Sequence, residues 1–217
     1  MSRILKYTLI ADGSSDKVLL DIIKWSLDNL YPKLSNNGVH ADFRNLLKPP
    51  ENGDVKARIL KAIKYYPCDI LFYHRDAEDN SATIIEERKS EVLNNADNKQ
   101  PIVCIVPVVM TESWLMFDEL AIKRASGNRN YKMGLDLPPI NRIESIKDPK
   151  DRLYKLLREI SGIKKRNLSK FNPGRMVHLI AEYIDDFSEL RGLSSFKVFE
   201  KDLKIAVENY IAHKPND

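Results

Sequence analysis

Acidic residues follow directly on a short apolar run in the first half of the chain. The run from Ile70 to Tyr73 has the composition of a fully buried parallel strand, and Asp76, Glu78 and Asp79 follow shortly after it. Asp76 and Glu78 occupy alternate positions, so an extended chain projects both carboxylates toward one face, where they could share a hard cation such as Mg²⁺. The alternative is an ordinary polar loop after a core strand.

A second acidic group stands near the N-terminus, where Lys6 to Ala11 is predicted to form a strand that ends at Asp12. Gly13 permits a tight turn, and a helix with Asp16 in its first turn is predicted to follow. Ligands of open α/β sheets bind outside the carboxyl ends of the strands, so Asp12 and Asp16 are candidates for the same site. A favourable interaction with the helix dipole is the simpler account of Asp16, but not of Asp12.

A third candidate acid follows the most β-prone stretch of the chain, Ile102 to Val109. Thr111 is predicted to cap a helix that runs to Ser126, which puts Glu112 just beyond the end of another core strand. The competing account is again an acid at the positive end of a helix dipole.

These acids need a rigid frame, and the order of the predicted elements supplies one. Strands and helices alternate over residues 1–126, with Val39 to Leu46 as a further strand, which predicts a Toprim/Rossmann-like α/β domain: a parallel sheet with helices on both faces. Residues 127–217 are predicted to form a connector and a C-terminal helical lobe packed on that domain. Asp148, Pro149 and Gly162 have the types expected at the start and the end of its first helix.

A basic segment lies between the first two predicted helices of the lobe. It holds five cationic residues near Phe171, namely Lys164, Lys165, Arg166, Lys170 and Arg175. Such a segment can lie along a phosphate backbone and bind DNA or RNA in a salt-dependent way. The alternatives are a solvated loop or an edge that docks on a partner protein.

The composition of the chain limits the classes of protein to which it can belong. The chain has 217 residues, a formal net charge of +4 and 43% hydrophobic residues, as expected of a globular domain that tolerates, but does not require, a nucleic-acid partner. Cys68 and Cys104 fall at or inside predicted strands and are interpreted as core residues in a reducing compartment. There is no membrane-length apolar run and no signal-peptide pattern, so we expect a cytoplasmic protein without a membrane partner.

The two acidic strand ends resemble the motifs of Toprim domains. Asp12-Gly13 is similar to the first motif, an acid followed by Gly at a strand tip, and Asp76-Ala77-Glu78 is similar to the second, Asp-x-Asp. Asp16 falls where the overcoming-lysogenization-defect nucleases carry a further acid. Glu112, followed by Ser-Trp-Leu, resembles a third motif of small Toprim-like bacterial proteins. The resemblance covers roughly the first 125 residues.

The resemblance implies a Mg²⁺- or Mn²⁺-dependent nuclease, acting with an ATPase partner in a phage-defence system. Its catalytic residues would be Asp12, Asp76 and Glu112, and its metal ligands would be Asp12, Asp16, Asp76, Glu78 and Asp79. The chain has no phosphate-binding Gly-x-x-x-x-Gly-Lys-[Ser/Thr] loop, so ATP would have to be bound by another chain. The sequence does not decide whether the protein forms a homo-oligomer.

A second hypothesis is a catalytically silent binding or scaffold subunit, which Asp12 in place of the family's usual Glu favours. Clustered carboxylates would support the nuclease, whereas carboxylates that are spread apart or paired to arginines would support the silent subunit.

Overall fold

The core of the molecule is an all-parallel sheet. The computed structural model describes residues 4–13, 15–81, 83–96, 100–164, 167 and 171–213. Within these residues the sheet has the strand order β2-β1-β3-β4. The strands are β1 (Leu5–Ile10), β2 (Asn36–His40), β3 (Ile70–His74) and β4 (Ile102–Ile105). The parallel sheet predicted from the sequence is confirmed.

Helices cover both faces of the sheet, as alternation of strand and helix predicts. The helices between the strands are α1 (Leu19–Leu30), α2 (Val55–Tyr65) and α3 (Ile84–Leu93). Leu9 and Phe72 belong to the hydrophobic cluster that α1 joins. Ile10 and Leu71, their neighbours along the same strands, belong to the cluster that α2 joins on the other face.

The order of the strands creates a switch point between β1 and β3. The chain moves from β1 to β2 in one direction across the sheet, and β3 and β4 then lie on the other side of β1. Ile10 pairs with Tyr73, and His74 pairs with Ile105, so β1, β3 and β4 end near one another. In doubly wound folds with this order the crevice at the β1/β3 switch point is where ligands bind.

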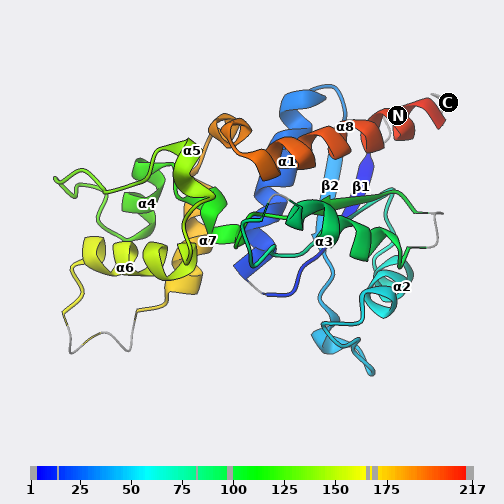
Figure 1. Ribbon diagram of the computed structural model, residues 1–217, viewed down its shortest axis with the longest axis horizontal. Helices are drawn as coiled ribbons and strands as arrows, with labels where there is room; N and C mark the ends of the chain where they lie inside the picture. The colour runs from blue at the N-terminus through cyan, green and yellow to red at the C-terminus, as the bar shows by residue number, and fades with distance from the viewer. Residues whose placement is uncertain are drawn as a thin grey trace.

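The rest of the chain is helical. Its helices are α4 (Glu119–Ala125), α5 (Ile140–Ile143), α6 (Pro149–Ser161), α7 (Pro173–Tyr183) and α8 (Ser194–His213). Helices α4 to α7 gather at one end of the molecule, and α8 returns to pack on β4 (Figure 1). The predicted limits of α6 are confirmed, since Asp148 caps its first turn and Gly162 ends it in the left-handed conformation, φ 62°.

One hydrophobic cluster runs from the sheet into this helical region, and it includes Trp114, Leu157, Ile180 and Phe199. The helical C-terminal region is therefore packed on the sheet. The boundary at residue 126 stays a prediction. In the residues described, no helix has the length and apolar character needed to cross a membrane.

Three predicted elements differ from the observed ones, each because a polar or proline residue ends the regular structure. The strand predicted from Val39 to Leu46 is instead β2, since Asp42 accepts a hydrogen bond from the backbone N–H of Arg44 and turns the chain into a 3₁₀ helix. The strand predicted from Ile102 ends before Pro107, which has no N–H to donate.

The long helix predicted from Thr111 to Ser126 is two shorter ones. Residues Thr111–Leu115 form a 3₁₀ helix, and Asp118 begins α4 by accepting a hydrogen bond from the N–H of Ala121. Thr111 caps no helix with its side chain, so that prediction is wrong, and its side chain contributes to the site described next.

Candidate functional site

His74, the last residue of β3, lies at the centre of a group of polar side chains at the switch point. It is buried, with 1% of its surface exposed. Its Nε2 lies 3.1 Å from Oδ1 of Asp76 and 2.9 Å from Oγ1 of Thr111. Its Nδ1 lies 3.8 Å from Oδ2 of Asp16. His74 therefore links an acid that follows β1 with an acid that follows β3.

The charge on His74 is set by these acids. Burial by itself lowers the pKa of His74, but the hydrogen bond to Asp76 and the negative charges of Asp76 and Asp16 outweigh it and raise the pKa above its ordinary value. Asp12 acts in the same direction. The raised pKa favours a positive charge on the buried imidazole beside the carboxylates of Asp76 and Asp16.

Asp76 is held firmly in place. Its Oδ1 accepts hydrogen bonds from the backbone N–H of Thr111 at 2.9 Å and from the Thr111 hydroxyl at 3.3 Å, besides its contact with His74. The backbone that leaves β4 thus fixes the rotamer of an acid that follows β3. The side chain of Asp76 keeps 29% of its surface exposed, so the carboxylate still reaches solvent.

Asp16 is brought to the same place by the turn after β1. Its Oδ2 accepts a hydrogen bond from the N–H of Gly13 at 2.8 Å, which closes the turn. Only 7% of the Asp16 surface is exposed, which is unusual for an acid in the first turn of a helix. The dipole account of Asp16 therefore does not describe its position fully, because the carboxylate is buried beside His74.

Glu112 completes the group from the segment after β4, and 3% of its surface is exposed. Burial is the largest cause of a raised pKa at Glu112, and the negative charges of Asp76 and Asp16 raise it further. Lys150 on α6 opposes the rise, with its Nζ 3.6 Å from Oε1 of Glu112. Among the described residues that Oε1 has no hydrogen-bond partner. We call Asp16, Asp76 and Glu112, with His74, the acid cluster.

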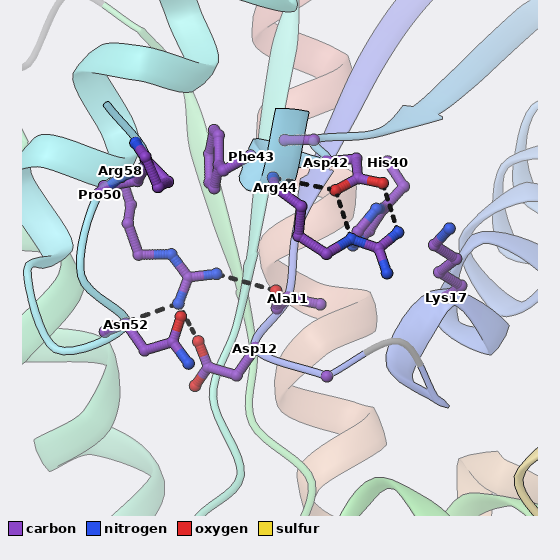
Figure 2. A pocket seen from close by; sticks show the side chains of 13 residues that line it. Ala11, Asp12, Lys17, His40, Asp42, Phe43, Arg44, Pro50, Asn52 and Arg58 are labelled. Carbon is purple, nitrogen blue, oxygen red and sulfur yellow. Dashed lines mark hydrogen bonds and ion pairs between the residues drawn. The ribbon is translucent and has the colours of Figure 1, made fainter. Parts of the chain in front are cut away.

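Asp12 has a different partner. Its carboxylate forms an ion pair with Arg58 of α2, whose guanidinium also donates to the backbone oxygens of Ala11 at 2.8 Å and Asn52 at 3.2 Å (Figure 2). Arg58 is almost fully buried at 2% exposure, while 42% of the Asp12 side chain is exposed. Asp12, which the sequence predicts to be catalytic, thus lies beside the acid cluster, and its charge is neutralised by Arg58.

Glu78 and Asp79 are placed at the surface of the loop after β3. Glu78 has a positive φ of 59°, its side chain is 73% exposed, and Oε2 lies 3.6 Å from an Arg88 nitrogen. The Asp79 carboxylate accepts hydrogen bonds from the N–H groups of Asn80 and Ser81, which shapes the loop. In the described part of the chain neither side chain contacts the acid cluster.

The predicted nucleic-acid contacts fall mostly outside the described residues, where Lys165, Arg166 and Lys170 lie. Lys164 is exposed after α6, and Arg175 is exposed in the first turn of α7. Their role in binding nucleic acid stays a prediction.

Three residues of the site were not predicted from the sequence: His74, Lys150, and Thr111 as a side-chain hydrogen-bond partner of His74 and Asp76. His74 carried a signal, because a histidine that ends an otherwise apolar strand faces the same edge as the acids that follow it. Lys150 carried none, since it reaches the cluster from α6, a helix that sequence patterns do not place in space.

The acid cluster has the donor chemistry that a hard divalent cation requires, namely carboxylate oxygens from three strand ends and a buried oxygen of Glu112 without a hydrogen-bond partner. In the part of the chain that the structure describes, no group of three or more acidic, histidine or cysteine side chains lies close enough together to ligate one ion. The three carboxylates would therefore have to turn toward one another to share a cation, with Lys150 moving away from Glu112.

No protein-family model, curated protein or solved structure matches this chain. The resemblance to Toprim domains accordingly stays a prediction from the motifs at Asp12, Asp76 and Glu112.

Proposed function

We propose that this protein hydrolyses phosphodiester bonds of DNA or RNA with Mg²⁺ or Mn²⁺, in the manner of a Toprim nuclease. The observation that carries the proposal is the contact of His74 with Asp16 and Asp76 at the β1/β3 switch point, together with the buried Glu112, whose pKa is raised by burial and by the charges of these two acids. Buried carboxylates that repel one another are costly in the absence of a cation. Such an arrangement is typical of sites selected for ligand binding rather than for stability.

Asp16, Asp76 and Glu112 would hold the metal. When bound, a divalent cation lowers the pKa of an attacking water and stabilises negative charge on the phosphate oxygens. Thr111 and His74 would keep the Asp76 carboxylate in one orientation, as hydrogen-bonded partners of metal ligands commonly do. Lys150, 45% exposed, would be free to contact a phosphate once Glu112 turns to the cation.

Of the metal ligands predicted from the sequence, Asp16 and Asp76 are kept in this proposal, and Glu112, predicted as a catalytic residue, is proposed as a third ligand. Asp12, paired with Arg58, is proposed to support the site from its rim, and Glu78 and Asp79 are proposed to be dispensable.

A cleavage assay tests this function. Supercoiled plasmid and single-stranded RNA are incubated with the purified chain in Mg²⁺, Mn²⁺ or Ca²⁺. We expect cleavage with the first two ions but not with Ca²⁺, whose looser coordination positions a water poorly. Asp76→Asn and Glu112→Gln should lower the rate on the order of a hundredfold or more. Glu159→Gln, an exposed acid on α6, is the matched control.

The ion pair between Asp12 and Arg58 favours a second candidate, a binding subunit without catalysis. In that case the wild-type chain binds nucleic acid but does not cut it, even with Mn²⁺ and with any ATPase partner added. Cleavage that Asp76→Asn and Glu112→Gln leave unchanged would contradict the acid cluster as the active site and would indicate a contaminating nuclease.

A further inference from the structure

A concave site lies beside the acid cluster, and its lining includes Asp12 and Gly13 of the turn that leads from β1 to Asp16. It is a pocket of about 570 Å³ between the carboxyl ends of β1 and β2, and we call it the Arg58 pocket. Its volume falls within the ~300–1,000 Å³ typical of small-molecule sites. The loop from Phe43 to Asn52, which connects β2 with α2, forms its outer wall.

Charged side chains of both signs line this pocket. The cations are Lys17, Arg44 and Arg58, and the carboxylates are Asp12 and Asp42. Arg58 is held by Asp12, and Arg44 by Asp42 at 2.5 and 2.8 Å, whereas Lys17 has no ion pair among the described residues. The buried Nε of Arg58 also lacks a hydrogen-bond partner there.

The pKa of His40, which also lines the pocket, is lowered by burial as well as by the nearby cations. Burial lowers the pKa of His40 to about 4, and the positive charge of Lys17 is the next largest cause. Arg44 and Arg58 add to this effect and Asp42 opposes it. Both ring nitrogens of His40 lack hydrogen-bond partners in the described part of the chain. A neutral imidazole keeps one donor and one acceptor for a ligand.

The two sides of the pocket differ in character. Figure 2 shows Lys17, His40 and Arg44 on one side, and Pro50, Asn52 and Arg58 on the other, with Phe43 between them. The first side offers cations that suit a phosphate group. Pro50 on the second side and Phe43 between the two offer flat surfaces, and any of the bases can stack on an aromatic ring.

We propose that the Arg58 pocket binds one nucleotide unit, with its phosphate at Lys17 and Arg44 and its base against Phe43 and Pro50. This inference rests on the proposed function in taking the nucleotide to be part of the strand that the acid cluster cuts. Asp12 and Gly13, which lie between the two sites, would place the neighbouring phosphodiester beside Asp16.

Calorimetric titration of the full chain in EDTA tests the pocket, with AMP, adenosine and inorganic phosphate as probes. We expect AMP to bind with a Kd below about 1 mM. Adenosine and free phosphate should each bind about tenfold or more weakly, because each lacks one half of the contacts. Lys17→Gln and Arg44→Gln should weaken AMP binding by a similar factor. Neither change removes a core side chain, and Lys197→Gln on α8 is the matched control.

Undetectable AMP binding, or AMP binding that both substitutions leave unchanged, would overturn the proposal. Phosphate that binds as tightly as AMP would overturn the role of the base. Because EDTA removes the cation, this result is independent of cleavage. AMP binding by a chain that never cuts would contradict only the nuclease, whereas cutting without AMP binding would contradict only the pocket.

Discussion

Arg58 of α2 forms an ion pair with Asp12, the residue that ends the extension of β1, and the two differ sharply in burial. Arg58 is 2% exposed, whereas the Asp12 side chain is 42% exposed. The guanidinium also lies over the rings of Phe43 and Tyr73, at 5.8 and 5.7 Å from their centroids. A buried cation in such surroundings depends on its counter-ion.

The first prediction follows from this dependence. Asp12→Asn removes the counter-ion and leaves a buried guanidinium charge, so the free energy of unfolding should fall by about 1–3 kcal/mol, less than for a fully buried pair because Asp12 is partly in water. Urea denaturation measures it. In an Arg58→Met background the same change should cost much less, and an equal cost in both backgrounds would show that the pair is not coupled.

The second prediction concerns Glu112, whose pKa is raised mainly by burial. Glu112→Gln keeps the shape and removes the buried charge, so in EDTA it should raise the free energy of unfolding by about 0.5–2 kcal/mol. The exposed control, Glu159→Gln, should stay within about 0.5 kcal/mol of wild type. A clear loss of stability in Glu112→Gln would mean that the carboxylate has a structural role.

The third prediction is a pH dependence set by His40. Its pKa is lowered from 6.5 to about 4 in the folded protein, by burial and then by Lys17, with Arg44 and Arg58 adding to the shift and Asp42 opposing it. Between pH 6.5 and about 4 the imidazole of His40 is protonated in the unfolded chain but stays neutral in the folded chain. The stability that comes from burying the neutral imidazole is therefore complete above pH 6.5 and is lost as the pH falls toward 4. His40→Gln should lose less stability than wild type between pH 7 and about pH 4.5. Identical pH profiles in urea denaturation would refute the assignment.

The fourth prediction tests the close packing of β1 on β2. A Cβ at Gly38 would lie 2.1 Å from Cε2 of Tyr7, a ring that is 3% exposed. Gly38→Ala should therefore cost about 1–3 kcal/mol by overpacking. Gly53→Ala is the control, since a Cβ there meets nothing within 4 Å. Equal stability of the two variants would show that Tyr7 can move aside.

The sheet could be predicted because its signals are local. The buried strands β3 and β4 read as largely apolar runs, and Asp12 and Asp76 each stand two residues after the end of a strand, while Glu112 follows β4 at a greater distance. The predicted strand ends were less accurate where a side chain redirected the backbone, as Asp42 does after β2.

The partners of the acids could not be predicted because they are distant in sequence. Arg58 is 46 residues from Asp12, and Lys150 reaches Glu112 from α6 in the helical region. Hydrophobic periodicity places a helix on a face of the sheet, but it does not set the angle or height that decides which cation meets which carboxylate. The motifs place these acids after the strand ends, and packing decides that Asp16 rather than Glu78 lies beside His74.

Binding of Mn²⁺ to the metal-free chain, measured by titration calorimetry, tests the central claim most directly. If Asp16, Asp76 and Glu112 hold one cation, wild type should bind Mn²⁺, and Asp16→Asn and Glu112→Gln should each weaken binding on the order of tenfold or more. Glu78→Gln, which changes an exposed acid outside the acid cluster, should bind as wild type does. Wild type without Mn²⁺ binding, or Glu112→Gln that binds Mn²⁺ as tightly as wild type, would contradict the account.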